Sequence, residues 1–395
     1  MSEEETDKEK MLKPNKYHID DFEEAFRVIK IDEENYIGAH PLEKPIKQAR
    51  GVYGGHTVAQ TLLVAIESTR DPHTQEVFIP DSFHTYFIAA GESKVPMEYK
   101  VAKLFDDGNI AKRSITVIQM GRVRCNCICS LYKRGGGDHK PSRQQLDVDF
   151  QIPTPPLQLK YPDVDKLYQI QHTGYIRNAY SEEFLDYNLC PEEDLLKPAE
   201  RWITVWSGIK NQPLPGHEDK YEIRKDNIKN SNDKIVTIEN KIINRKHLKS
   251  FKDPMYNYVG LADLSDSALL TTMARVLHIP WNPTQDHAFE EYDDSKDAVL
   301  LLGNSINMLH LFHYNAMSLD HHIYFHNDHY EDSNDPTSYD IVREWLCFTY
   351  QMKRLSNNRT LVRGFLFNEH KKCVATIVQE GLTYLFNGVP DNAKL

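Results

Sequence analysis

The chain has 395 residues, of which 27% are charged and 40% hydrophobic, and its formal net charge is −11. This length exceeds the roughly 250–300 residues at which a single core stops growing, so it favours two domains or a duplicated unit. The acidic balance argues against a nucleic acid as partner, because phosphate binding needs a basic surface. We expect no membrane span, because no apolar run approaches ~20 residues.

The first half contains one apolar helix followed by a group of strands. The opening MSEEETDKEK is unlike a signal peptide and predicts a disordered acidic tail over residues 1–19. The segment GGHTVAQTLLVAIEST, residues 54–69, has apolar side chains at helical spacing. After DSFHTYF, at residues 81–87, three strand-like segments begin at Lys94 and are joined by short turns with Asp or Gly. They predict an antiparallel meander.

Three of the six cysteines lie in the last segment of this meander, as CNCIC at positions 125, 127 and 129. They have neither zinc-type pair spacing nor the density of a disulfide scaffold. Alternate residues of a strand share a face, so we predict that these side chains fill a core. Free cysteines of this kind indicate a reducing compartment.

The second half repeats the order of the first. Glycines and prolines interrupt residues 134–165, which we interpret as a linker, and residues 229–254 read as a charged insertion. A second apolar helix is predicted over residues 265–277, SDSALLTTMARVL. LDHHIYF at residues 319–325 then matches DSFHTYF, and a second meander begins at Glu344. We therefore predict two units, residues 20–133 and 166–388, the second with insertions, and a tail over residues 389–395.

Five blocks in this order resemble the landmarks of the acyl-CoA thioesterase II family, the double-hotdog thioesterases: RGVYGGHTVAQTLL, DSFHTYFIAAGES, LADLSDSALL, SLDHHIYFH and VATIVQEG. The likeness covers roughly residues 20–135 and 200–385. It implies an α+β fold of two fused hotdog units, each a long helix wrapped by a curved antiparallel β-sheet. It also implies hydrolysis of fatty acyl-CoA to fatty acid and coenzyme A, with no metal or other cofactor.

The resemblance places the family's water-holding Asp, Ser or Thr, and Gln on Asp266, Ser318 and Gln379. Asp266 follows Ser265, a good helix cap, so we expect it in a first turn whose partial positive charge favours an ionised general base. The stretch LADLSDSALL contains a second acid, and a short shift of register would select Asp263 instead.

Gln379 is unusual because it lies among apolar residues in KCVATIVQEGLTYL. A buried amide must find hydrogen-bond partners or cost roughly 1–3 kcal/mol. Strand alternation puts Gln379 on one face with Cys373, Ala375 and Ile377. Counting from the last turn of each meander aligns Gln379 near Cys129, which cannot orient water as an amide does. We therefore expect one half to carry the chemistry. A helix start or the glycines of GGHTV would supply oxyanion donors.

A rival group of ligands lies in the block DHHIYFHNDH: Asp320, His321, His322, His326 and His329. These residue types suit zinc, although His84 occupies the place of His322 in the first half and indicates a structural role. The same histidines keep open a hotdog hydratase or dehydratase. A non-catalytic acyl-CoA-binding protein is the third alternative.

Binding and location are predicted from isolated signals. The phosphates of coenzyme A need cations, and Arg50, Arg354, Arg359 and Arg363 lie near the blocks named above. The terminal tripeptide Ala393-Lys394-Leu395 is close to the S-K-L address that the peroxisomal import receptor reads, and it predicts the peroxisomal matrix. Hotdog units associate in pairs, so the resemblance also allows a homo-oligomer.

Overall fold

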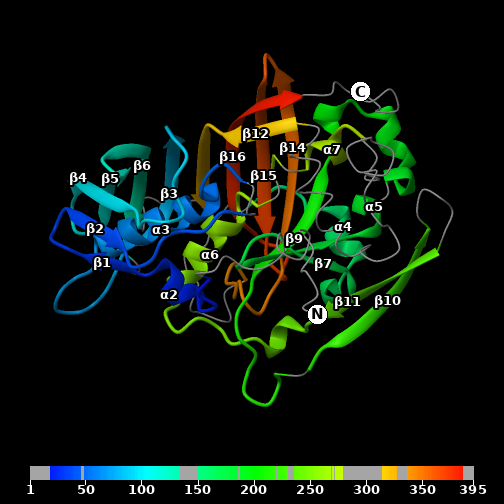
Figure 1. Ribbon diagram of the computed structural model, residues 1–395, viewed down its shortest axis with the longest axis horizontal. Coiled ribbons are helices and arrows are strands. Elements are labelled where there is room, and N and C mark those ends of the chain that lie inside the picture. The colour runs from blue at the N-terminus through cyan, green and yellow to red at the C-terminus, as the bar shows by residue number, and fades with distance from the viewer. Residues whose placement is uncertain are drawn as a thin grey trace, which may run out of the picture.

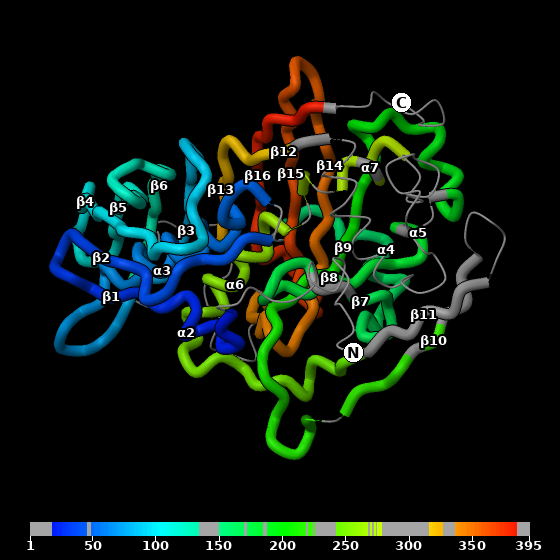
Figure 2. Tube along the Cα trace, viewed as in Figure 1, coloured from blue at the N-terminus to red at the C-terminus, as the bar shows by residue number. Residues whose placement is uncertain are grey.

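The computed structural model describes residues 18–45, 49–133, 150–185, 187–218, 220–229, 235–267, 269–270, 272–278, 314–326 and 336–385. Most of the acidic tail, residues 134–149 of the linker and the terminal tripeptide therefore lie outside the described residues. In Figure 1 the blue and cyan N-terminal strands lie on the left, and the orange and red strands of the second meander stand near the centre. Figure 2 traces the same course of the chain as a tube.

The first meander is as predicted. Its strands are β4 (Glu98–Asp106), β5 (Ile110–Gln119) and β6 (Arg122–Tyr132), and the predicted helix is α3 (Gly54–Glu67). The segment DSFHTYF lies in β3 (Ile79–Phe87), which pairs with β6. Cys125, Cys127 and Cys129 are buried with free thiols, which confirms that they fill a core. The alternation of buried and exposed residues along β5 and β6 explains why the sequence identifies these strands.

The second meander continues the same sheet. Its strands are β14 (Leu346–Ser356), β15 (Arg359–Phe367) and β16 (Cys373–Leu385). Both β12 (Tyr314–Ser318) and β13 (Asp320–Phe325) pair with β16. The remaining strands of the sheet are β1 (Val28–Lys30), β2 (Asn35–Gly38), β7 (Tyr168–Gln171), β8 (Ile176–Tyr180) and β9 (Ile203–Ile209). In the described part, fourteen strands form one antiparallel sheet.

The strand order mirrors itself about the pair β3–β13. It reads β4-β5-β6-β3 on one side and β13-β16-β15-β14 on the other. At the centre, His84 of β3 lies opposite His322 of β13. This position matches the sequence correspondence between DSFHTYF and LDHHIYF.

The second long helix differs from the prediction. It is α6 (Tyr256–Leu264), with Ser265 as its C-cap residue, and the described residues of 265–277 form only the short α7 (Met273–Val276). Every residue of α6 except Asn257 is buried, so it shows no amphipathic stripe to find. The Ser265 hydroxyl, which contacts the carbonyl of Ala262, is of a type that competes with helical hydrogen bonds.

Helix α6 packs directly against α3. The Tyr53 hydroxyl donates to the backbone carbonyl of Asp263, and a Cβ on Gly55 would lie 2.3 Å from that same oxygen. Gly55 therefore allows the two helices to approach closely. As a result, the start of α3 lies beside the end of α6.

Two further parts cover or extend the sheet. Residues 150–167, with α4 (Pro156–Lys160), pack over a second apolar cluster that includes Trp206, Trp345 and Phe367. The hairpin of β10 (Glu222–Lys229) and β11 (Ile235–Ile242) forms its own two-stranded sheet; β11 lies in the predicted insertion, residues 229–254, whereas β10 precedes it. The short helices that remain are α2 (Phe22–Phe26), α5 (Glu182–Leu185), η1 (Val164–Lys166), η2 (Tyr187–Leu189), η3 (Pro191–Leu195), η4 (Pro198–Glu200) and η5 (Arg245–His247).

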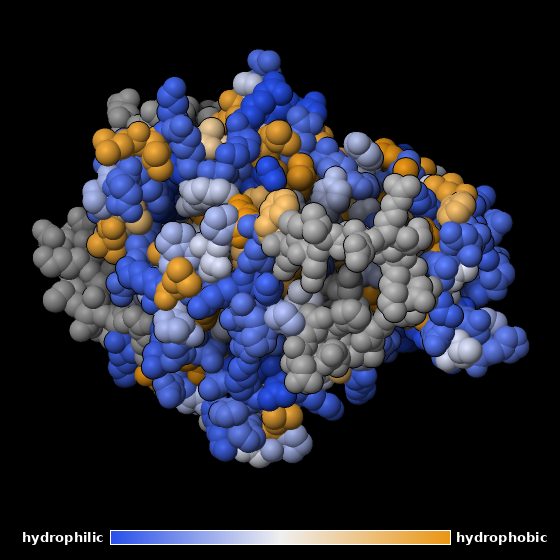
Figure 3. Space-filling view, turned by 180° about the vertical axis from the view of Figure 1, so that it is seen from behind, coloured by the Kyte–Doolittle hydropathy of each residue, from blue (hydrophilic) through white to orange (hydrophobic). Residues whose placement is uncertain are grey.

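The surface is mixed in character. On the face in Figure 3, hydrophobic residues form small separate groups among hydrophilic ones. Over the described ranges, the longest helices are too short or too polar to cross a membrane.

Candidate active site

The structure brings Asp266, Ser318 and Gln379 together. Gln379 Nε2 lies 2.9 Å from Asp266 Oδ1 and 2.5 Å from Ser318 Oγ, and the Ser318 hydroxyl lies 3.4 Å from Asp266 Oδ1. The three side chains come from the turn after α6, the end of β12 and the middle of β16. Gln379 is fully buried, whereas Asp266 and Ser318 are partly exposed, so the group is closed from one side and open from another.

The inward position of Gln379 follows from strand pairing. Gln379 lies opposite Val362 of β15. Alternate residues of β16 share its face, and Ile377 and Ala375 are likewise fully buried. Cys373 departs from the predicted face, because an irregularity in the β15–β16 pairing lies between Ala375 and Cys373. Cys373 instead packs against the second apolar cluster, which includes Trp206, Trp345 and Phe367. The prediction for Cys373 was therefore wrong.

The surroundings of Asp266 also correct a prediction. Ser265 ends α6, so Asp266 does not lie in a first helical turn. The helix start beside it is that of α3, where the backbone N–H of Gly55 donates to the Asp266 carboxylate. A Cβ on Gly54 would lie 2.7 Å from Asp266 Oδ2, so glycine is required for this approach. The first half thus supplies the helix terminus that the sequence assigned to the second.

Opposing influences set the proton affinity of Asp266. The pKa of Asp266 is raised to about 6, chiefly by burial and to a lesser extent by the charge of nearby Asp263. Hydrogen bonds donated by Gln379, Gly55 and Ser318 act in the opposite direction and lower it. A carboxyl group with a pKa near 6 is largely ionised at pH 7 and still basic enough to accept a proton. Asp266 therefore has the character of a general base.

Asp263, the alternative acid, has a different place. It is fully buried, and its Oδ1 lies 2.6 Å from Nδ1 of His56, which is also fully buried. This pair connects α6 to α3 within the helix contact. Asp263 acts on Asp266 by charge, three residues away, and Gln379 contacts Asp266.

The histidines near residue 320 separate into different environments. His322 Nδ1 lies 3.0 Å from His84 Nδ1, and His322 Nε2 lies 3.6 Å from Asp320. His326 Nε2 contacts the Thr376 hydroxyl at 2.8 Å. Among the residues that the structure describes, no three His, Cys, Asp or Glu side chains are grouped to hold a metal ion. His329 lies outside those residues.

His321 belongs to this group of side chains, although the sequence suggested it only for the alternatives of a metal site or a hydratase. It is fully buried, with Nδ1 2.9 Å from Gln379 Oε1 and Nε2 2.7 Å from the Ser265 hydroxyl. Burial lowers the pKa of His321 to about 4, so the ring is neutral at pH 7. The alternation of buried residues along β13 is the signal that distinguishes inward His321 from its neighbour His322.

The predicted phosphate-binding arginines do not gather at this site. Arg50 and Arg354 are exposed, and Arg359 pairs with Glu380. Arg363 lies over the Phe365 ring at 5.0 Å, and strand alternation puts it on the face of β15 opposite to Val362. Contact between these arginines and the phosphates of coenzyme A therefore stays a prediction.

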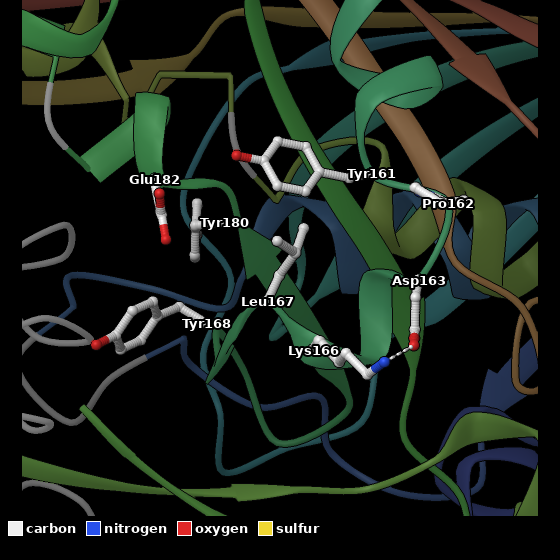
Figure 4. Close-up of a pocket in the computed structure, with 8 residues that line it drawn as sticks. All are labelled: Tyr161, Pro162, Asp163, Lys166, Leu167, Tyr168, Tyr180 and Glu182. Atoms are coloured by element: carbon white, nitrogen blue, oxygen red, sulfur yellow. Dashed lines mark ion pairs between the residues drawn. The ribbon is translucent and has the colours of Figure 1, made fainter.

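Two of the hollows in the described part of the molecule lie away from this site. One, of about 270 Å³, is lined by Tyr161, Leu167, Tyr180 and their neighbours, with an ion pair between Lys166 and Asp163 at its edge (Figure 4). The other, of about 680 Å³, lies over the outer face of the second meander and includes Arg363. Asp266, Ser318 and Gln379 line neither.

Comparisons with known proteins show which family the chain is similar to. The family model "Acyl-CoA thioesterase C-terminal domain" matches residues 246–383, a range that contains Asp266, Ser318 and Gln379. The chain is 20% identical, over 94% of its length and 96% of the relative, to "Peroxisomal acyl-coenzyme A thioester hydrolase 1" of Saccharomyces cerevisiae.

Solved structures share the fold. A Thermobifida fusca protein assigned as a thioesterase II is 12% identical, with a TM-score of 0.53 over 95% of this chain and 99% of that one. A protein with a hot dog fold from Alicyclobacillus acidocaldarius is 11% identical, with a TM-score of 0.50 over 92% and 98%. These structures show the fold, while the family model over residues 246–383 and the full-length relative show that the chain is similar to acyl-CoA thioesterases, which are thioester hydrolases.

Proposed function

We propose that this chain hydrolyses fatty acyl-CoA with a water molecule held by Asp266, Ser318 and Gln379. The observation that carries the proposal is the mutual contact of a carboxylate, a hydroxyl and a carboxamide at a partly exposed position. Each side chain has a distinct capacity, because the carboxylate accepts a proton while the two neutral groups orient water.

The reaction follows from these capacities. Asp266 removes a proton from the water as its oxygen attacks the thioester carbonyl carbon, and a tetrahedral oxyanion forms. Collapse of this intermediate breaks the carbon–sulfur bond, and the proton on Asp266 passes to the departing thiolate. The products are a fatty acid and coenzyme A with its free thiol. The carboxylate of Asp266 is regenerated, so no other reactant is required.

The proposal includes an architecture of two fused hotdog units. Its support is the mirrored strand order about β3–β13 and the contact between α3 and α6. By the pairing register, Cys129 lies opposite Phe83 in one half, at the place of Gln379 in the other. Only the second unit therefore contributes the amide, while the first contributes the N-terminal end of α3.

We further propose that the protein acts in the peroxisomal matrix. The terminal Ala393-Lys394-Leu395 and the name of the yeast relative support this location. Deletion of the tripeptide should move a fluorescently tagged chain, with the tag at the N-terminus, out of peroxisomes. An unchanged distribution would contradict the predicted contact with the import receptor.

The experiment that tests the function is a thiol-release assay on saturated acyl-CoAs of increasing length. We expect one free thiol for each fatty acid released, and loss of release in Asp266→Asn. Glu380→Gln is the matched control, because Glu380 neighbours Gln379 but pairs with Arg359. Binding of acyl-CoA without thiol release would contradict the proposal.

A further inference from the structure

Gln379 can serve the proposed reaction in only one orientation of its amide. Its Nε2 faces two oxygen atoms, Asp266 Oδ1 and Ser318 Oγ, and its Oε1 faces His321. A rotation by 180° would put Oε1 against the Asp266 carboxylate, where two acceptors repel each other. It would also remove the donor that helps to keep the carboxylate ionised.

The hydrogen bonds assign the tautomer of His321. Gln379 Oε1 can only accept, so His321 Nδ1 must carry the ring hydrogen and donate it. In the neutral ring Nε2 is then an acceptor. The Ser265 hydroxyl lies 2.7 Å from Nε2 and 2.9 Å from the Ala262 carbonyl, and its single hydrogen must point to Nε2, because two acceptors would otherwise face each other there. The donors therefore run in one direction, from Ser265 through His321 and Gln379 to Asp266.

We propose that His321, held by Ser265, is a positioning residue that fixes the Gln379 amide with its NH₂ group toward Asp266 and Ser318. This inference rests on the proposed function of those three residues. Burial of both His321 and Gln379 means that water does not replace the contact when one partner is lost.

The first half provides an internal reference for this role. His84 and His322 lie opposite each other at the centre of the sheet, and the residue before each is Phe83 in β3 and His321 in β13. Phe83 is opposite Cys129, whereas His321 contacts Gln379. The polar residue thus occurs only in the half that has an amide to orient.

Other titratable groups surround this chain of hydrogen bonds. They are Asp263 on α6 with its partner His56 on α3, Tyr53 before α3, and Asp320 and His322 on β13. None of these groups is changed in the variants described next. A shift in the pH profile of kcat therefore reports on the contact between His321 and Gln379.

The test compares His321→Leu, which lacks a donor, with His321→Asn, whose amide can reproduce the donor at the Nδ1 position. We expect kcat of H321L to fall by about 10- to 100-fold with KM within about twofold, the scale of lost positioning. The acid limb of its pH profile should move to higher pH, on the order of half a unit, because Gln379 no longer donates steadily to Asp266. H321N should retain most of the activity and the original limb.

The double variant H321L/Q379A decides whether His321 acts through Gln379. We expect it to be no slower than Q379A, because the second residue has nothing left to orient. A full additional loss would overturn the proposal, as would wild-type kcat and acid limb in H321L. If Q379A itself retains wild-type activity, the proposed function fails; if Q379A is impaired and H321L is not, only the positioning role fails.

Ser265→Ala provides the same test if H321L does not fold. Loss of the hydroxyl removes the donor to Nε2 and should lower kcat several-fold, with an acid limb displaced in the same direction. The loss should again disappear in the Q379A background. Wild-type kcat and limb in a folded S265A would overturn the role of this chain of hydrogen bonds.

Discussion

The two halves of the sheet place different pairs of residues at equivalent positions. In the first half Phe83 packs beside Cys129, both fully buried, and in the second half His321 contacts Gln379, also fully buried. The strands pair in the same way around both, so the fold accepts either an apolar pair or a hydrogen-bonded polar pair. The comparison teaches that the architecture does not require the amide, whereas the proposed chemistry does.

The largest expected effect is that of Asp266→Asn, which removes the proposed general base from the half that contains His321 and Gln379. General acid–base contributions are typically about 10²- to 10⁴-fold, and we expect thiol release to fall within that range. Purified enzyme is assayed at saturating acyl-CoA, with Glu380→Gln as control. Undiminished release would show that the base lies elsewhere.

Alanine substitutions at the equivalent positions Gln379 and Cys129 test most clearly whether the two halves differ in function. Gln379→Ala should lower turnover by about 10²- to 10³-fold, because one positioning donor is lost. Cys129→Ala, its counterpart, should leave turnover unchanged and cost about 1 kcal/mol of stability through a small cavity. Both are measured by thiol release and denaturant unfolding. Equal losses of activity would mean that the halves do not differ in function.

Removal of the Ser318 hydroxyl should have a smaller effect. Ser318→Ala leaves Gln379 in contact with Asp266, so the water loses one of its partners and kcat should fall by about 10-fold. Ser318→Thr keeps a hydroxyl and serves as the matched control. A loss in S318T as large as that in S318A would indicate steric disturbance of the β12 end instead.

The smallest effect concerns stability. Burial raises the pKa of Asp266 to about 6, above its value in the unfolded chain, so its ionisation opposes folding at neutral pH. Asp266→Asn should therefore be more stable than wild type above pH 6, on the order of 1–2 kcal/mol, with the gain disappearing below about pH 4. Thermal unfolding over this pH range measures it. A destabilised variant at pH 8 would contradict the assigned burial cost.

Local patterns predicted much of the fold. The alternation of apolar and polar residues revealed both meanders, and the repeated order of the blocks identified His84 and His322 as equivalent positions in the two halves. The second helix was misplaced, because α6 is buried on nearly every side and lacks the stripe that marks α3. The face of Cys373 was wrong because a local irregularity in strand pairing leaves no mark in residue types.

The site was predictable in its residues but not in its surroundings. The resemblance named the three side chains that meet. It did not reveal that the helix start beside Asp266 belongs to the first half, since Gly55 and Asp266 are far apart in sequence. His321 entered the sequence analysis only through rival interpretations, because its nearest neighbours in sequence are acids and histidines, while Gln379 meets it only across strands.

The central claim is that ionised Asp266, held by Gln379, activates water. The most direct measurement is kcat/KM against pH for wild type and Gln379→Ala with one acyl-CoA. We expect an acid limb near pH 6 in wild type and a limb at higher pH in the variant, because donation from Gln379 lowers the pKa of Asp266. Ionisation of the substrate is common to both enzymes and cancels. A wild-type profile without an acid limb, or a limb that Gln379→Ala does not move, would contradict the claim.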